Sequence, residues 1–262
     1  MHYCLICCSI LTKVLIRVIF VIKVSGQVTI SAKNLGELAL PDFCERCFWL
    51  KLRLENKLPF QIFPGIFSSI DSYTKNIVQG FVDSNGEFPV WLGDLGELVG
   101  YQKPPHFSKF NILDNESNVL LRGSPDGVFV RKDNSYLIVD YKTAKYTEKQ
   151  DQLLPMYEVQ LNAYVAIGEQ CGLSPVSGLA LIYMEPVTHS DAVVDSANYR
   201  DDGFAMGFTA HIHEVELNPS SIPPLLVKVR EIHELSNAPD GCDGCKDCQI
   251  LERIAEVTGV YS

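Results

Sequence analysis

The sequence predicts an α/β domain with a central mixed β-sheet flanked by helices. The prediction depends on the order of two kinds of hydrophobic pattern. A pattern with helical spacing covers residues 65–82 and another covers residues 155–170. Strand-like runs lie between them at Val119–Val130 and Tyr136–Tyr141, and a further run follows at residues 178–184. Helical and strand segments in such an order are typical of α/β domains.

The composition is that of a globular protein. The 262 residues are 47% hydrophobic and 21% charged, whereas a disordered chain is poorer in apolar residues and richer in charge. The net charge of −10 argues against a protein that coats nucleic acid non-specifically, since such proteins carry a basic face. It does not exclude an enzyme acting on nucleic acid, because a site that holds a cation needs carboxylates.

Residues 1–26 form an apolar N-terminal extension. Lys13, Arg17 and Lys23 interrupt it, which argues against a membrane-spanning helix. The pattern of a signal peptide is not clear either. Three interpretations stay open: an extension unrelated to the fold, a membrane or surface anchor, and a genuine helix. We therefore assign the domain to residues 27–262 and expect no membrane partner.

The first part of the domain predicts helices followed by irregular structure. Ser31 is a candidate N-cap for a short helix that continues to Leu40. Apolar residues spaced by three and four predict the helix over residues 65–82, namely Ile66, Ile70, Tyr73, Ile77 and Phe81. Residues 83–118 are rich in Gly, Pro and Asn, and we expect short strands and loops there.

The second part predicts a hairpin and then alternating elements. The polar turn Arg131–Ser135 separates the two strand-like runs. After the helix at residues 155–170, strands are expected at residues 178–184 and 208–217. A final helix at residues 222–236 leads to a group of cysteines.

The candidate catalytic residues lie across the predicted hairpin. Side chains alternate along a strand, so Asp140 and Lys142 share one face. A hairpin centred on Asp133 pairs Val128 with Ile138 and brings Asp126 opposite Asp140. Opposed residues have Cβ atoms roughly 4.5–5.5 Å apart, and two like charges so placed destabilise a sheet. A divalent cation reverses the sign of that interaction, and hard cations take oxygen ligands.

An alternative interpretation is a solvated hairpin face with ordinary surface charges. The apolar run Leu137–Val139 directly before Asp140 argues against it, since such a run is typical of a strand buried on both faces. A buried Asp and Lys need partners. The pattern therefore favours a site over a solvated surface.

Two groups of cysteines indicate a second site. One C-x-x-C motif contains Cys44 and Cys47, and a C-x-x-C-x-x-C motif contains Cys242, Cys245 and Cys248. This spacing favours metal ligation in a reducing compartment over disulfides, and we expect a cytoplasmic protein. Thiolates so spaced suit Zn²⁺ or an iron–sulfur cluster. Five cysteines compete for four places, so we expect one bystander.

Three short motifs resemble those of a known family, in that family's order. They are Gly123-Ser124-Pro125-Asp126-Gly127, Val139-Asp140-Tyr141-Lys142-Thr143 and Gln160-Leu161-Asn162-Ala163-Tyr164. They resemble the G-x-x-D, D-x-K and Q-x-x-x-Y motifs of the PD-(D/E)XK nuclease superfamily, within it the RecB-like and CRISPR-associated exonuclease branch. The resemblance covers about residues 28–250, including the first cysteine pair.

The resemblance implies a restriction-endonuclease-like core and a role for each motif residue. Asp126 and Asp140 would ligate Mg²⁺ or Mn²⁺, and Lys142 would position the attacking water. Gln160 and Tyr164 would support the site or touch the substrate backbone. The branch also expects a ligand on the first core helix; Asp71 is the candidate there, although it matches no strict motif.

The resemblance further implies DNA as substrate, expected as single strands or ends, in repair, recombination or foreign-DNA processing. A helicase or other repair proteins would be partners. A four-iron (4Fe-4S) cluster is slightly favoured over structural Zn²⁺, and it would join the N- and C-terminal segments. The alternative function is a catalytically inactive nucleic-acid-binding protein that keeps an iron–sulfur or zinc site.

Overall fold

The computed structural model describes residues 26–56, 64–147 and 152–259. The expectations for the N-terminal extension therefore lie, apart from Gly26, outside the described residues. In the part of the chain that is described, no helix is both long enough and apolar enough to cross a membrane.

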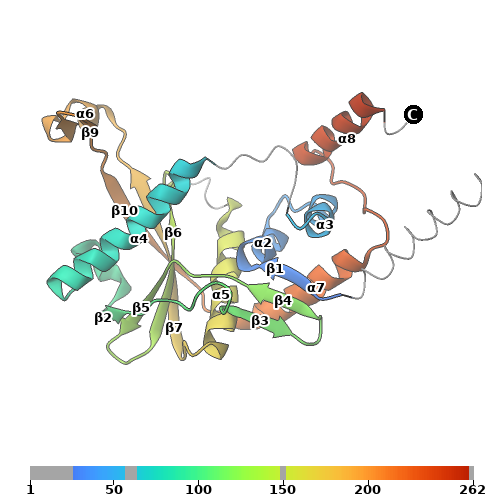
Figure 1. The fold of residues 1–262 in the computed structure, drawn as a ribbon, viewed down its shortest axis with the longest axis horizontal. Coiled ribbons are helices and arrows are strands. Elements are labelled where there is room, and N and C mark those ends of the chain that lie inside the picture. Colours follow the sequence, from blue (N-terminus) through green and yellow to red (C-terminus); the bar gives the residue numbers. More distant parts are fainter. Residues whose placement is uncertain (1–25, 57–63, 148–151, 260–262) are drawn as a thin grey trace, which may run out of the picture.

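A five-stranded mixed sheet forms the centre of the fold (Figure 1). Its order is β10 (Phe208–Val215), β7 (Val176–Pro186), β6 (Tyr136–Lys142), β5 (Gly127–Arg131) and β2 (Leu98–Tyr101). Strands β6 and β7 are parallel, while the other neighbours are antiparallel. The predicted mixed sheet is confirmed.

A second, three-stranded sheet consists of β1 (Val28–Ser31), β4 (Val119–Arg122) and β3 (Asn111–Asp114). Strand β4 pairs parallel to β1 and antiparallel to β3. A short hairpin of β8 (Tyr199–Arg200) and β9 (Gly203–Phe204) completes the described strands.

The prediction of one continuous strand from Val119 to Val130 was wrong. The run divides into β4 and β5, which belong to different sheets. Gly123 and Pro125 lie in the break, and proline cannot donate a ladder hydrogen bond. The segment between the two strands carries the chain from one sheet to the other and ends at Asp126.

The expected helices are present, and three further helices were not predicted, α3 (Glu45–Arg53), α6 (Ser190–Val194) and α8 (Lys246–Thr258). Asn34 N donates to Ser31 Oγ at 3.1 Å, which confirms the predicted N-cap. The helices are α2 (Ala32–Gly36), α3 (Glu45–Arg53), α4 (Gly65–Asn85), α5 (Leu154–Gln170), α6 (Ser190–Val194), α7 (Ile222–Glu234) and α8 (Lys246–Thr258), with 3-10 turns η2 (Glu37–Ala39), η3 (Val90–Leu95), η5 (Ser196–Asn198) and η6 (Pro219–Ser221).

The main sheet is buried on both faces. Ile138 of β6 lies in the larger core, which includes Leu161 and Val165 of α5. Its neighbour Val139 lies in a second core, which includes Val78 of α4. Adjacent side chains of a strand point to opposite faces, so α5 and α4 cover opposite sides of the sheet. Strand β6 is thus the doubly buried strand that its apolar run predicted.

Helix α4 contacts the sheet through a narrow stripe. Thr74 and Val78 are buried, whereas Ile66, Tyr73 and Ile77 are 61%, 63% and 47% exposed. The helix is confirmed, but most of the apolar residues that predicted it face outward. Asp71 and Lys75 lie on the same side of α4 as this buried stripe, because positions three and four apart are neighbours on a helix. Both charged side chains therefore face the sheet.

Candidate active site

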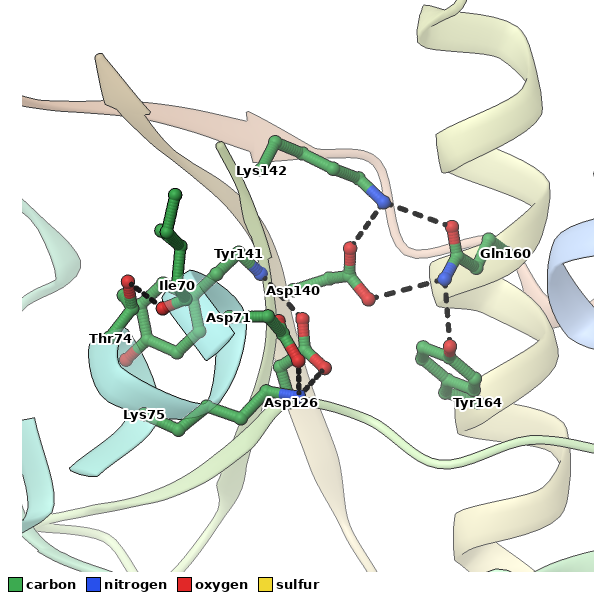
Figure 2. Close-up of polar contacts among 10 residues, drawn as sticks. All are labelled: Ile70, Asp71, Thr74, Lys75, Asp126, Asp140, Tyr141, Lys142, Gln160 and Tyr164. Atoms are coloured by element: carbon green, nitrogen blue, oxygen red, sulfur yellow. Dashed lines mark hydrogen bonds and ion pairs between the residues drawn. The ribbon is translucent and has the colours of Figure 1, made fainter. Parts of the chain in front are cut away.

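The hairpin register brings the two predicted aspartates level with each other. Val128 pairs with Ile138 and Gly127 with Val139, as the sequence predicted. Asp126 directly precedes β5, and its Oδ2 accepts a hydrogen bond from the backbone N of Tyr141 at 2.9 Å. Figure 2 shows the Asp126 carboxylate beside Asp140, on the side toward helix α4.

Asp140 is the centre of a buried polar network on the α5 side. Only 3% of the residue is exposed. Its Oδ2 lies 2.5 Å from Lys142 Nζ, and its Oδ1 accepts from Gln160 Nε2 at 3.2 Å. Lys142 Nζ donates to Gln160 Oε1 at 3.2 Å, and Gln160 Nε2 donates to Tyr164 Oη at 2.7 Å. Four of the predicted site residues are therefore joined by direct contacts (Figure 2).

Tyr164 links this network to the strand break. A Cβ on Gly123 would lie 2.5 Å from Tyr164 Cε1, so only glycine fits against the ring without displacement. Burial, and then the charge of Asp140, raise the pKa of Tyr164 well above its usual value. Its hydroxyl therefore stays protonated and supports Gln160 as a neutral group.

Tyr157 is a site residue that the sequence analysis missed. Lys142 Nζ lies 4.0 Å from the centre of the Tyr157 ring, a cation–π contact. Tyr157, Gln160 and Tyr164 are three and seven positions apart, so they share one face of α5. This spacing was a signal that could have identified Tyr157. The ring therefore contacts the Lys142 ammonium in addition to Asp140 and Gln160.

Lys75 was also missed, and it occupies the other side of the site. Its Nζ lies 2.7 Å from Asp126 Oδ1 and 2.7 Å from Asp71 Oδ2. Asp71 and Lys75 are four positions apart on α4, a spacing that predicts an ion pair. Lys75 thus connects Asp71, which lies on α4 as expected, to Asp126.

The negative charge of Asp126 is only partly neutralised by its surroundings. Burial, followed by the negative charge of Asp140, raises the pKa of Asp126 to about 7, although Lys75 opposes the shift. Despite the opposing effect of burial, Asp126 raises the pKa of Lys75. A buried carboxyl group whose ionisation is opposed in this way is a place where a bound cation lowers the free energy.

The donor set fits a hard divalent cation. Carboxylate oxygens suit Mg²⁺ or Mn²⁺, which are often held by one or two carboxylates with water completing the shell. Asp126 and Asp140 offer that pair. The three aspartates are not gathered into a closed cage, since among the described residues only a group of thiols brings three or more ligand atoms within 4.8 Å of one another.

That thiol group consists of Cys44, Cys47, Cys245 and Cys248. Sγ of Cys248 lies 3.6 Å from that of Cys44 and 3.5 Å from that of Cys47, and Cys47 Sγ lies 3.6 Å from that of Cys245. The cluster joins the start of α3 to the start of α8, beside an ion pair between Arg46 and Glu252 at 2.8 Å.

Cys242 is the expected bystander. It is exposed, its Sγ lies 3.3 Å from the carbonyl oxygen of Phe43, and it neighbours Cys44 without being one of the four mutually close thiols. The arrangement is two cysteines from each end of the domain. The cluster thus joins the N- and C-terminal segments, as the resemblance implied.

A mixed sheet flanked by helices, with paired acids and a lysine across its central hairpin, defines a nuclease-type α/β fold. The family model of the PD-(D/E)XK nuclease superfamily matches residues 83–253, and the chain belongs to this superfamily. The matched segment includes Asp126, Asp140 and Lys142 but not Asp71 or Lys75.

Matches to individual proteins are more distant. Thirteen chains of solved structures match, among them one titled "Crystal structure of SSO0001", which is 12% identical. That match covers 82% of this chain and 80% of the other, with a TM-score of 0.38. No curated protein matches.

The raised pKa of Asp126 predicts a pH-dependent stability of the metal-free protein. A carboxyl group whose pKa is about 7 when folded and 3.8 when unfolded stabilises the fold fully below about pH 4. This contribution is lost as the pH rises toward 7. In EDTA, the free energy of unfolding of the native protein should fall by about 2–4 kcal/mol relative to Asp126→Asn between pH 4 and 8.

Urea unfolding at several pH values measures this difference. Asp42→Asn makes the same chemical change at an exposed position and is the control. Parallel stability curves for the native protein and Asp126→Asn would contradict the account of Asp126.

Proposed function

We propose that this protein is a metal-dependent nuclease that hydrolyses phosphodiester bonds of DNA. The observation that carries the proposal is the convergence of Asp126, Asp140 and Lys142 at one end of the central hairpin. Membership of the PD-(D/E)XK superfamily supports a nuclease activity. Residues 27–262 would form the nuclease domain.

Asp126 and Asp140 would hold Mg²⁺ or Mn²⁺, with Asp71 as a candidate third ligand. The bound ion would lower the pKa of a water and stabilise charge on the scissile phosphate. Lys142 would orient the attacking water and offset charge on the phosphate, because its ammonium is held beside Asp140 by Gln160 and the Tyr157 ring. A positioned group of this kind contributes typically 10²–10⁴-fold to rate.

Gln160 and Tyr164 are proposed as positioning residues. Gln160 donates to Asp140 and accepts from Lys142, so it sets the relative orientation of the acid and the amine. Tyr164 fixes the orientation of the Gln160 amide, because its hydroxyl accepts a hydrogen bond from Gln160 Nε2. A ligand carboxylate held by such outer contacts presents its free lone pairs toward the metal.

The finer assignments depend on the motif resemblance. We propose a RecB-like exonuclease acting on single strands or ends of DNA, in repair, recombination or foreign-DNA processing, with a helicase or other repair proteins as partners. The contacts of Gln160 with Asp140 and Lys142, and of Tyr164 with Gln160, support the branch. A cytoplasmic location is proposed from the spacing of the cysteines.

The second candidate function is a nucleic-acid-binding protein without catalysis. The Cys cluster is compatible with it, since a structural metal needs no active site. The buried ion pair of Asp140 and Lys142 favours catalysis instead. Burying such a pair stabilises a fold no better than well-packed apolar residues do, so stability alone gives no reason for it.

We also propose that the four thiols bind one Zn²⁺ rather than the four-iron cluster that the resemblance favoured. A tetrahedral ion with Zn–S bonds of about 2.3 Å places its sulfurs about 3.8 Å apart. The contacts of 3.5–3.6 Å between the thiols are close to that spacing. A four-iron cluster carries each thiolate on a separate iron and so needs a wider set.

Burial opposes ionisation of Cys44, but hydrogen bonds from the backbone of Cys242 and Cys47 lower the pKa of Cys44 to about 6. At neutral pH this cysteine is therefore available as a thiolate, whereas burial raises the pKa of Cys47 and of Cys248, so those thiols ionise only with a cation beside them. A thiolate is the form that ligates a metal.

Cleavage of labelled DNA tests the nuclease directly. The protein should degrade single- or double-stranded DNA with Mg²⁺ or Mn²⁺ and not with EDTA. Asp140→Asn and Lys142→Met should each lower the rate about a hundredfold or more, because each removes a group from the reacting centre. Lys132→Met, which removes an exposed lysine paired with Glu97, should leave the rate unchanged.

Equal cleavage by the native protein and Asp140→Asn would contradict the assigned site. Metal-independent DNA binding with no cleavage by the native protein would support the second function. Thermal unfolding of each variant separates loss of chemistry from loss of the fold.

Metal analysis of the purified protein tests the cysteine site. Anaerobically purified protein should contain about one zinc per chain and no iron. Cys248→Ser should lose the zinc and unfold at a lower temperature, whereas Cys242→Ser should keep both zinc content and stability. A brown protein with about four irons per chain would overturn the zinc proposal and support the iron–sulfur cluster.

A further inference from the structure

We propose that Lys75 is a displaceable internal cation that competes with divalent metal for the carboxylate of Asp126. The inference rests on the proposed function, since it assumes that Asp126 and Asp140 hold the metal. It assigns a role to a residue that lies outside the matched family segment.

The contacts of Lys75 define it as a stand-in for a metal ion. Its Nζ lies 2.7 Å from one oxygen of Asp126 and 2.7 Å from one oxygen of Asp71. These are two of the three carboxylates proposed as ligands. The other Asp126 oxygen accepts from the backbone N of Tyr141. In this state both oxygens of Asp126 are therefore engaged.

The charge balance of the site explains why the ammonium takes this place. Three carboxylates, those of Asp71, Asp126 and Asp140, lie with two ammonium groups, those of Lys75 and Lys142. Lys142 neutralises Asp140, and Lys75 bridges the other two acids. Without Lys75, Asp126 would be buried with no cation at contact distance among the described residues, which is costly for a charged group.

A metal ion held on the Asp126 carboxylate would lie within a few ångström of the Lys75 ammonium. Mg²⁺ takes its oxygens at about 2.0–2.1 Å, and at that range the two positive charges repel each other, so the ion gains most when the ammonium moves away. The side chain of Lys75 is 28% exposed, and it is long and flexible. It can swing to solvent without moving α4, because Thr74 and Val78 anchor the helix to the sheet.

This exchange would set the metal preference of the site. The apparent affinity for the ion is proportional to the fraction of time that Lys75 leaves the site open, so it falls as Lys75 occupies the site more. A monovalent cation gains little by replacing a group of the same charge. A divalent ion carries one more positive charge than the ammonium, so its attraction to the carboxylates of Asp126 and Asp140 is stronger. Lys75 would thus keep the site free of monovalent ions while lowering its affinity for Mg²⁺ and Mn²⁺.

Manganese binding tests the proposal without relying on activity. Titration of full-length, zinc-loaded protein with Mn²⁺, followed by the electron paramagnetic resonance signal of the free ion, gives the dissociation constant. Lys75→Met should bind Mn²⁺ about tenfold more tightly than the native protein, as for a site that is closed about nine-tenths of the time. Lys75→Gln should behave alike and serves if the first variant does not fold.

Two control variants bound the interpretation. Lys132→Met removes an exposed lysine without touching the site and should bind Mn²⁺ as the native protein does. Lys75→Arg keeps the charge and should bind no more tightly than the native protein. Unchanged or weaker Mn²⁺ binding by both Lys75→Met and Lys75→Gln would overturn the competition.

Failure of the proposed function gives a different result. Tighter Mn²⁺ binding by Lys75→Met, lost again in Lys75→Met combined with Asp140→Asn, supports the competition even if the protein cleaves no DNA. Absence of Mn²⁺ binding in every variant would overturn the competition together with the metal site itself.

Discussion

The burial of an aspartate–lysine pair at the end of β6 is the constraint on which the site depends. Strand β6 is covered on both faces by hydrophobic cores. Asp140 and Lys142 lie at the end of this strand, where the cores end. Taking two charges out of water costs several kcal/mol per ion unless each is paired and hydrogen-bonded. The neighbouring elements supply these partners. Helix α5 contributes Gln160 to both charges and the ring of Tyr157 to the ammonium.

The same requirement accounts for the form of the strand break before β5. The chain passes against the Tyr164 ring at Gly123, where a side chain does not fit, and then delivers Asp126 beside Asp140. On the opposite side of the sheet, α4 presents its narrow buried stripe and places Asp71 and Lys75 at Asp126. The site therefore lies where the two sides of the sheet meet. Asp140 and Lys142 come from the side that α5 covers, and Asp71 and Lys75 come from α4 on the other side.

The thiol cluster lies apart from the acids and the lysines, between α3 and α8. It joins α3 to α8, and α3 is tied further to the end of α7 by hydrogen bonds from Trp49 and Arg53 to the carbonyl oxygen of Leu235. These segments are about two hundred residues apart in sequence, as the pair of Cys44 and Cys248 illustrates. A metal at the thiols would close a long loop, and its contribution would be to the fold rather than to the reacting centre.

Strand alternation and a short turn were sufficient to predict the pairing across the hairpin, because register is strongly specified where one face is buried. The roles of Lys75 and Tyr157 could not be predicted in this way. Both depend on how α4 and α5 approach the sheet, although each lies at helical spacing from a residue that was identified. The division of Val119–Val130 was missed because the apolar pattern on both sides of Gly123 is strand-like. The spacing of five cysteines alone could not identify Cys242 as the one left out.

The central claim is that Asp126 and Asp140 share one hard cation. Diffraction from crystals soaked in Mn²⁺, collected at a wavelength where manganese scatters anomalously, locates that ion directly. The account predicts an anomalous peak within about 2.2 Å of a carboxylate oxygen from each of the two aspartates. A peak that contacts neither carboxylate, in crystals that bind manganese elsewhere, would contradict it.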